Sequence, residues 1–383
     1  MDVALVVAGD LETTSGGFAY DRLLVDRLRD RGHAVDVISL PRRSYARHLL
    51  DNLRPLVDGK PLGRRLSDPD VVVQDGLCHP SLVGVNRRLD APVVALLHML
   101  RSEAEAAAPG GRSRAIRREV VRRVERRYLL GVDAAIYNSR ATRDSVEALV
   151  GGDGPDGVVA PPAGDRFEST LDVAGTENHL DVDEQTILER ARESVDGLEV
   201  VFLGNVVERK GLDVLVRGLA DLDEDVAWRL TVVGDTTVDP GYVRRVQQLV
   251  DREVVAGRAG VGDRVDFAGR LPDEAVAASL RDAHVVAMPS RYEPYGIASL
   301  EGMCVGCVPV ATTNGGPPEF VDDGDSGFLV DPVDVAGVAG ALEALADPGR
   351  LAAMGVAARR AYERQPTWEV SLDRAVDLLE ALP

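Results

Sequence analysis

The chain has 383 residues, of which 45% are hydrophobic and 28% charged, and this balance predicts a globular protein of two domains rather than a disordered, fibrous or disulfide-stapled one. No apolar run approaches the roughly 18 residues that span a bilayer, and the first residues lack the basic segment of a signal peptide, so we expect a cytoplasmic protein. The net charge of −19 excludes a broad basic surface, and we therefore expect no nucleic-acid partner.

The first 150 residues alternate between short apolar runs and helical periodicity. An apolar run at residues 3–8 is followed by a glycine-containing loop, a helical pattern at 18–31 and a second apolar run at 34–40. This order predicts a βαβ unit of a parallel sheet. Further buried strands and the clearest helix of this half are predicted at residues 71–74, 93–97, 134–137 and 112–130.

The alternation breaks at residues 151–164, which are dense in glycine, proline and aspartate, and the acidic residues 168–183 that follow have few apolar side chains. We interpret this region as the connection between two domains. Strands and helices then alternate again before a helical C-terminal segment. The strands are predicted at residues 199–203, 230–233, 264–267, 285–288 and 308–311, and the helices at 212–222, 242–256, 273–282, 296–305 and within 332–382.

Strands that alternate with helices predict the α/β class, with two Rossmann-like domains that each contain a doubly wound parallel sheet. We place the N-terminal domain at residues 1–165 and the C-terminal domain at residues 166–365. In sheets of this kind, ligands bind at the carboxyl ends of the strands. The functional residues are therefore expected in a cleft that both domains face.

Two glutamates and a predicted helix start stand together in the segment 291–332. Glu293 follows a predicted strand, and Glu301 lies about a turn and a half inside a helix that begins at Gly296. The free N–H groups of Gly296 and Ile297 can bind a phosphate, and a deeper carboxylate can accept hydrogen bonds from a ribose. Such an arrangement would suit a nucleoside diphosphate as ligand. The alternative is structural, with Glu293 capping the helix and Glu301 exposed to solvent.

This segment resembles the signature of the retaining glycosyltransferases of family 4, which have the GT-B fold. The signature joins a Glu-x-Phe/Tyr-Gly step and a second glutamate to a Gly-x-Pro-Val strand, a Gly-Gly-x-x-Glu turn and a Gly-Phe/Leu-Leu-Val strand. In this chain its parts are Glu293, Tyr295, Gly296, Glu301, residues 306–310, Gly315, Gly316, Glu319 and residues 327–330.

The resemblance implies a role for each matching residue. Glu293 would lie beside the donor sugar and the reacting centre, Glu301 would hold the ribose hydroxyls, and the amides that follow Tyr295 would bind the diphosphate. The resemblance also implies that a last helix, at residues 366–383, crosses back to pack on the N-terminal domain.

A second stretch, at residues 200–211, is similar to the family's strand, loop and Lys-Gly step. Lys210 matches the lysine that offsets the charge of the leaving diphosphate. Asn205 stands where the family usually has an arginine, and Arg209 is a candidate for the missing positive charge. The alternative for Lys210 is an exposed residue at a helix start.

Weaker correspondences extend the resemblance over most of the chain. They imply that Arg270 and Leu271 cradle the nucleotide base through their backbone and that His98 lies near the donor sugar. They also imply that the amides of Gly16 and Gly17, in a loop, approach the diphosphate, because only glycine lets the backbone come so close. For His98 the alternative is a structural histidine whose polar atoms are already paired.

We therefore predict a glycosyltransferase that moves a hexose, with retention, from a nucleotide diphosphate sugar to a hydroxyl of a glycan or a lipid-linked acceptor. The predicted catalytic residues are Glu293, Lys210 and His98, with no metal and no resident cofactor. The alternatives are another GT-B enzyme, such as a nucleotide-sugar epimerase or a phosphorylase, a non-catalytic protein that binds sugar nucleotides, or a two-lobed solute-binding protein.

Residues 112–127 concentrate positive charge in an otherwise acidic chain, with eight arginines and two glutamates. Ile116, Val120, Val124 and Tyr128 recur every four residues and predict one apolar stripe on a helix. One interpretation is a helix that binds anionic lipid at the inner membrane face. The other is a crossover helix that packs on the sheet through this stripe, with its arginines in solvent.

The acidic composition has two explanations. An excess of Asp and Glu suits high salt, where ions screen the repulsion between like charges, so one hypothesis is a salt-adapted protein. Lys60 and Lys210 are the only lysines among 44 basic residues, and a GC-rich coding bias toward arginine would produce the same usage.

Overall fold

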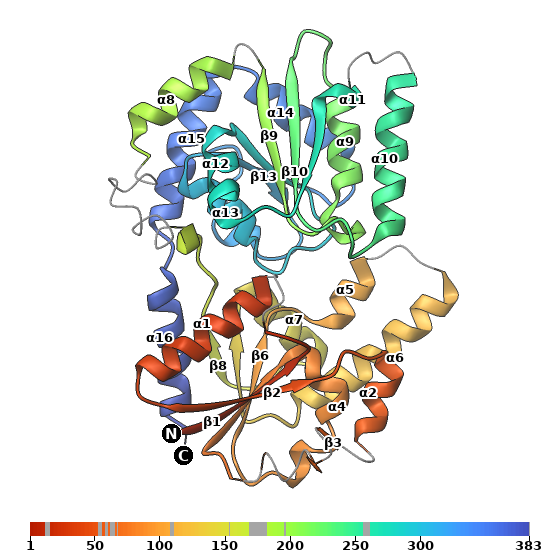
Figure 1. The fold of residues 1–383 in the computed structure, drawn as a ribbon, viewed down its shortest axis with the longest axis vertical. Helices are drawn as coiled ribbons and strands as arrows, with labels where there is room; N and C mark the ends of the chain where they lie inside the picture. Colours follow the sequence, from red (N-terminus) through yellow and green to blue (C-terminus); the bar gives the residue numbers. More distant parts are fainter. Residues whose placement is uncertain are drawn as a thin grey trace. The chain divides into compact units, whose positions relative to one another are not determined.

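The computed structural model describes the chain except for residues 12–15, 53–55, 58–59, 62–65, 67, 108–110, 153, 168–181, 195–196, 256–260 and 383 (Figure 1). The chain divides into two compact units. Unit 1 comprises Met1–Pro162 and Glu369–Pro383, and unit 2 comprises Ala163–Trp368. The acidic stretch interpreted as the connection, residues 168–183, lies outside the described residues except for its last two.

Unit 1 is built on a six-stranded sheet of order β2-β1-β5-β6-β7-β8, in which every neighbouring pair is parallel. Runs of valine, leucine and isoleucine form its central strands because both faces of such a sheet are buried. The strands are β1 (Asp2–Ala8), β2 (Ala34–Leu40), β5 (Val71–Asp75), β6 (Val93–Leu97), β7 (Ala134–Tyr137) and β8 (Gly157–Val159), with a separate hairpin of β3 (Leu56–Val57) and β4 (Lys60–Pro61).

The helices of unit 1 surround this sheet (Figure 1). They are α1 (Gly16–Asp30), α2 (Tyr45–Asp51), α4 (His79–Leu82), α5 (Arg101–Ala107), α6 (Arg112–Leu129), α7 (Arg140–Val150) and α16 (Trp368–Glu380). Two predictions need correction. The region 151–164, interpreted as a connection, contains the edge strand β8, which at three residues is too short to show periodicity. Gly16 and Gly17 begin α1 instead of lying in a loop.

Helix α6 does not pack through the predicted apolar stripe along its whole length. Ile116 is 67% exposed and Val120 is 43% exposed, and the first half of the helix is exposed to solvent. The predicted packing through the apolar stripe is wrong for the N-terminal half of α6, because only the C-terminal half lies against the unit 1 core. The buried side chains of α6 are Val121, Glu125, Tyr128 and Leu129.

Unit 2 is built on a second parallel sheet of six strands, in the order β11-β10-β9-β12-β13-β14. Numbered within the unit, this is the order 3-2-1-4-5-6 of dinucleotide-binding folds, and it reverses between β9 and β12. The strands are β9 (Leu198–Leu203), β10 (Trp228–Val233), β11 (Val265–Gly269), β12 (Val285–Met288), β13 (Val308–Thr312) and β14 (Phe328–Val330).

The helices of unit 2 cover both faces of this sheet (Figure 1). They are α8 (Glu184–Glu193), α9 (Leu212–Ala220), α10 (Pro240–Val255), α11 (Val261–Arg264), α12 (Asp273–Asp282), α13 (Ile297–Cys304), α14 (Val335–Leu345) and α15 (Pro348–Glu363). Parallel α/β architecture in both halves confirms the predicted class. Among the helices that the structure describes, none is long and apolar enough to cross a membrane.

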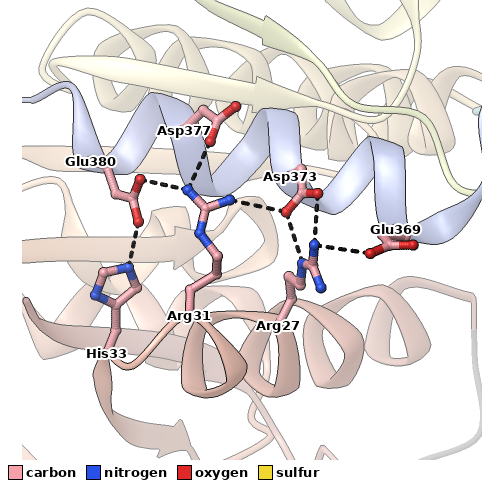
Figure 2. Close-up of polar contacts among 7 residues, drawn as sticks. All are labelled: Arg27, Arg31, His33, Glu369, Asp373, Asp377 and Glu380. Carbon is pink, nitrogen blue, oxygen red and sulfur yellow. Dashed lines mark hydrogen bonds and ion pairs between the residues drawn. The ribbon is translucent and has the colours of Figure 1, made fainter.

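The last helix, α16, packs beside α1, and this confirms that the C-terminal helix returns to the N-terminal half (Figure 2). Arg27 donates to both carboxylate oxygens of Asp373, at 2.8 and 2.7 Å. Arg31 bridges Asp373, Asp377 and Glu380. His33 completes the cluster through Glu380 at 2.8 Å. Arg27 near the end of α1, and Arg31 and His33 just after it, therefore meet a row of carboxylates on α16.

We expect Arg27→Ala to lower the free energy of unfolding by about 1 kcal/mol. A bidentate ion pair stabilises the fold more than a single surface contact does, but this one remains partly solvated. Arg27 lowers the pKa of Asp373 through their hydrogen bond, so this stabilisation is present above the ordinary aspartate pKa and is lost as the pH falls through the lower folded value. A double-mutant cycle with Asp373→Ala at pH 7 and pH 3 measures it. Equal coupling at both pH values would contradict the account.

Candidate functional site

The sheet of unit 2 brings Lys210 and Glu293 together where its strand order reverses. Lys210 ends a 3₁₀ turn, η6 (Glu208–Lys210), after β9, and Glu293 lies in the loop after β12. Lys210 Nζ lies 2.5 Å from Glu293 Oε2, with the two side chains only 15% and 10% exposed. Ser290 donates to the same oxygen at 3.1 Å, and Arg209 lies 3.7 Å from it.

The Glu293 carboxylate is ionised because cations surround it. Burial alone would raise its pKa, but Lys210, Arg209 and the hydrogen bond from Ser290 outweigh burial, and the pKa of Glu293 lies below its ordinary value. Burial lowers the pKa of Lys210, and Glu293 offsets that shift in part. Strongly perturbed pKa values are concentrated at functional sites, which makes this buried pair a candidate site.

Glycine fixes the approach of the lysine segment to the end of β12. Gly211 has φ +75°, and a Cβ there would come within 2.1 Å of the Pro289 carbonyl oxygen. Arg291, in the loop after β12, donates two hydrogen bonds to Asp213 on α9, at 3.0 and 2.9 Å. The Lys-Gly step of the sequence is therefore a close-packing requirement that places the Lys210 ammonium next to Glu293.

A second loop holds Glu293 from the other side. The Glu293 amide donates to the Asn314 carbonyl at 3.0 Å, and the Gly316 amide donates to the Glu293 carbonyl at 2.9 Å. Gly315 has φ +122°, and a Cβ there would sit 1.9 Å from the Glu293 carbonyl oxygen. The Gly-Gly turn of the motif thus allows two backbone segments to touch and fixes the backbone of Glu293.

The start of α13 lies next to this pair. Gly296 is the N-cap residue, with φ +111°, and no side chain caps the helix. Tyr295 is buried against Phe320 at a ring distance of 5.2 Å, and Ile297 is partly buried beside them. The structural alternative for Glu293 is wrong, because its carboxylate binds Lys210 and does not cap α13. Amides in the first turn of a helix are groups that can bind an anion.

Glu301 lies deeper in α13 and is 4% exposed, so it is not a solvated surface residue. Its Oε1 atom is 3.0 Å from Arg166 Nε. Burial raises the pKa of Glu301 to about 7, and the Arg166 guanidinium opposes the rise. The carboxylate is therefore buried beside one cation, which suits an acceptor of hydrogen bonds from a neutral diol.

The remaining unit 2 candidates are farther from the charge pair. Asn205 follows β9, directly after Gly204, where a Cβ would lie 3.6 Å from Lys210 Cε. Arg270 and Leu271 follow β11, the edge strand, which is separated from β9 by β10. The Arg270 side chain is exposed, with Asp235 at 3.9 Å, and Leu271 packs on the main core.

Unit 1 contains a separate polar cluster around His98, which follows β6. His98 Nε2 lies 2.7 Å from Asp21 Oδ1, and a Cβ on Gly17 would lie 3.2 Å from the imidazole ring. Asp75, at the end of β5, accepts a hydrogen bond from the Leu77 amide at 2.9 Å. Burial and then the charge of Asp21 raise the pKa of Asp75 to about 7. Two buried carboxylates, Asp21 and Asp75, thus lie near a half-buried imidazole that follows β6.

We expect Asp21→Asn to shift the titration of His98 to lower pH. Burial lowers the pKa of His98, but Asp21 and then Asp75 outweigh it, so the pKa is raised and the proton leaves only as the pH rises through that value. Without the Asp21 charge, burial dominates. NMR titration of the imidazole signals, assigned with His98→Gln, measures the shift, and an unchanged midpoint would contradict this electrostatic account.

Sequence reasoning missed Asp21, Asp75, Arg166 and Ser290. Asp21 lies on α1 one turn after Gly17, which is a weak local signal. The contact between Asp21 and His98 joins residues 77 positions apart, and no sequence motif predicts it. Arg166 lies just after the glycine- and proline-rich connection, where its composition indicated only a linker.

Two family models match the chain. The model described as Glycosyl transferases group 1 matches residues 183–361, and the model described as Glycosyltransferase Family 4 matches residues 15–163. A D-inositol 3-phosphate glycosyltransferase of Xylanimonas cellulosilytica is 34% identical over 72% of this chain and 63% of its own length. A GDP-mannose-dependent alpha-(1-6)-phosphatidylinositol monomannoside mannosyltransferase of Mycolicibacterium smegmatis is 36% identical over 47% of each chain. The chain spans less than two thirds of the length of these curated relatives.

Solved structures show the fold. Sucrose-phosphate synthase from Thermosynechococcus elongatus has a TM-score of 0.78 at 21% identity and covers 99% of this chain and 98% of its own. Anabaena HepE, solved with UDP and glucose, has a TM-score of 0.72 at 18% identity over the full length of both chains. The expected GT-B fold is thereby confirmed. Because the two family models together span most of the sequence and this fold agrees with them, the chain belongs to glycosyltransferase family 4.

Proposed function

We propose that this protein transfers a hexose from a nucleotide diphosphate sugar to an acceptor hydroxyl, with retention at the anomeric carbon. One observation carries the proposal. The buried Lys210–Glu293 pair lies beside the uncapped start of α13, at the point where the strand order of a nucleotide-binding type of sheet reverses. A cation next to a helix N-terminus is an arrangement that binds a diphosphate.

Each group in unit 2 has one task in this proposal. Lys210 and the amides of Gly296 and Ile297 stabilise the negative charge that builds on the departing diphosphate, with Arg209 as a supporting cation. Glu293 orients the sugar, and its hydrogen bond with Lys210 holds both side chains in place before the donor binds. The leaving phosphate oxygen receives the acceptor proton on the same face of the sugar.

The other proposed contacts follow from the family resemblance. Glu301 holds the ribose, Tyr295 and Asn205 support the loops that carry the diphosphate site, and the backbone of Arg270 and Leu271 lies against the base. In unit 1, His98 contacts the transferred sugar and the amides of Gly16 and Gly17, which stand in the first turn of α1, face the diphosphate. These assignments are proposals for single residues, and each can be tested by substitution.

The relatives suggest the chemical class of donor and acceptor. The mycobacterial relative is named for GDP-mannose and a phosphatidylinositol mannoside, the Xylanimonas relative for D-inositol 3-phosphate, and HepE was solved with UDP and glucose. We propose a UDP- or GDP-sugar as donor and a phosphate-bearing polyol, free or linked to a lipid, as acceptor. The proposed location is the cytoplasm.

Thermal shift with UDP-, GDP- and ADP-sugars in molar KCl tests the donor site. A ligand that binds only the folded state raises Tm with its concentration, so one nucleotide class should stabilise the protein above the others. Incubation with that donor and candidate acceptors should then release free nucleoside diphosphate and an α- or β-glycoside of the donor's own anomeric configuration. A new nucleotide sugar without release would indicate an epimerase, and binding without turnover would indicate a non-catalytic protein.

Helix α6 supports a second proposal, contact with anionic lipid at the inner face of the membrane. Its exposed Ile116 and Val120 stand among arginines in the half of the helix that does not pack on the core. Apolar side chains flanked by arginine on one exposed helix are typical of helices that lie on a membrane surface. This observation favours the lipid interpretation over the solvated crossover helix.

Flotation with vesicles tests the lipid contact. We expect the protein to float with vesicles that contain phosphatidylglycerol and to remain behind with phosphatidylcholine alone, because the arginines add about 1 kcal/mol each near an anionic surface. The paired substitution Ile116→Glu and Val120→Glu should abolish flotation. Val238→Glu, which changes an exposed valine of unit 2, is the matched control. Equal partition into both vesicle types would contradict the proposal.

The net charge of −19 supports a further proposal, that the protein is adapted to high salt. Screening of repulsion between carboxylates should raise Tm as KCl rises from about 0.1 M toward molar concentrations. A Tm that does not change, or that falls, over this range would leave coding bias as the explanation of the arginine usage.

A further inference from the structure

We infer that Arg166, in the segment that opens unit 2, is a positioning residue for ribose recognition: it holds one oxygen of the buried Glu301 carboxylate and leaves the other to accept a ribose hydroxyl. This inference rests on the proposed function, because it names a residue that acts on the nucleotide through Glu301. Arg166 stands outside the motifs that carry the family resemblance.

The Arg166 guanidinium contacts two carboxylates. Glu301 Oε1 lies 3.0 Å from Arg166 Nε, and Asp273 Oδ1, on α12, lies 3.8 Å from Arg166 Nη1. Glu301 is almost fully buried, whereas the Arg166 side chain is one third exposed. The guanidinium therefore approaches the carboxylate from the solvent side and fixes one of its two oxygens.

The segment around Arg166 is held in place by contacts within unit 2. A Cβ on Gly164 would lie 3.0 Å from the backbone carbonyl of Leu300, the residue before Glu301. The Trp368 amide lies 3.4 and 3.3 Å from the two carboxylate oxygens of Asp165. Arg166 thus follows two residues that pack or bond within unit 2, and a short 3₁₀ turn, η3 (Asp165–Phe167), presents it to α13.

The Arg166 guanidinium also acts on the charge of Glu301. Both oxygens of an ionised carboxylate are acceptors, whereas the neutral acid carries a proton on one of them, and burial without a cation favours the neutral acid. Arg166 is the group that favours the ionised form, and Asp273 opposes it, among the charged groups that the structure places against Glu301. Arg166 therefore both holds the Glu301 carboxylate in position and favours its ionised form.

The test compares nucleotides with and without ribose hydroxyls by calorimetry. GDP and UDP are each paired with the 2′,3′-dideoxy form, and the wild type should bind the ribose form about 10-fold more tightly or better, because a buried carboxylate left without its hydroxyl partners costs affinity. Arg166→Gln should weaken ribonucleotide binding about 10-fold at pH 7 and leave the dideoxy form almost unchanged, so that the preference disappears. Arg364→Gln, which alters an exposed pair with Asp322, is the control.

The pH profile separates this role from a merely structural one. The ribose preference of the wild type should fade as the pH falls through about 7, since Glu301 then binds a proton. In Arg166→Gln the same loss should occur at higher pH, because the favourable cation is gone. Arg166→Lys, which keeps the charge and is the safer variant for folding, should retain a pH midpoint close to that of the wild type and part of the preference.

The outcomes are distinguishable. A full ribose preference in Arg166→Gln, or tighter ribonucleotide binding in that variant, would overturn the inference and leave the proposed function intact, and tighter binding would mean that Arg166 competes with the ribose. If Arg166→Gln does not fold, a ribose preference of the wild type that is the same at pH 5 as at pH 8 would overturn it as well. A wild type that binds neither GDP nor UDP would overturn both this inference and the proposed function.

Discussion

Lys210→Met should reduce the kcat of sugar transfer by about 10² to 10³, the usual loss when one group that stabilises transition-state charge is removed. The substitution removes the ammonium that lies 2.5 Å from Glu293 and keeps the volume of the aliphatic stem. Donor KM should change less than kcat, because the charge on the leaving diphosphate is greatest in the transition state. Steady-state kinetics with the donor identified by thermal shift measures both.

The same substitution leaves the buried Glu293 carboxylate with Arg209 as its remaining cation, at 3.7 Å. Loss of one partner of a buried pair is strongly destabilising, and we expect about 2–3 kcal/mol here because Arg209 and Ser290 remain. The double variant Lys210→Met, Glu293→Gln removes the orphaned charge and should recover most of the stability without recovering activity. Recovery of both, or of neither, would contradict the separate roles given to this pair.

Gly315→Ala should destabilise unit 2 by about 3 kcal/mol or more and reduce activity together with stability. The added methyl would sit 1.9 Å from the Glu293 carbonyl oxygen, and the backbone at φ +122° is one that alanine avoids. The loop that carries Glu293 must therefore move, which separates the carboxylate from Lys210. Urea unfolding and transfer assays on the same preparation measure the two effects.

Gly324→Ala is the matched control for this prediction. Gly324 also has a positive φ, of +80°, but a Cβ there would meet no atom within 4 Å. Its substitution should therefore cost only the conformational strain, about 1 kcal/mol, and leave the kinetics unchanged. If both alanine variants were equally stable and active, contact between the two loops could not be what fixes Glu293.

Most strands were predictable because their residues are apolar and β-branched on both faces, and β6, β7 and β12 begin and end at the predicted residues. Strand β8 was not predictable, since three residues in a segment rich in glycine and proline show no alternation of apolar and polar side chains. The packing of α6 was predicted only for its second half. Periodicity identifies which residues share a face of a helix, but not how far a neighbouring core extends along that face.

The candidate site divides in the same way. Glu293 and Glu301 were singled out from their order and spacing after a predicted strand, and Lys210 from its match to the family's Lys-Gly step. Their pairing was not foreseen, and neither were Arg166 and Asp21. These contacts are made between segments distant in sequence, and the side chains that make them have no fixed spacing from the motif residues. Burial, which sets the pKa of Glu301 and Asp75, is likewise a property of the folded unit.

The central claim is that unit 2 receives the donor between the ammonium of Lys210 and the start of α13. A crystal structure of the protein with a nucleotide sugar of the class found by thermal shift tests it directly. We predict a phosphate oxygen within hydrogen-bonding distance of Lys210 Nζ and of the Gly296 or Ile297 amide, with the ribose hydroxyls on Glu301. A nucleotide bound elsewhere, with the Lys210–Glu293 pair and the Arg166–Glu301 pair unchanged and free of ligand, would contradict the claim.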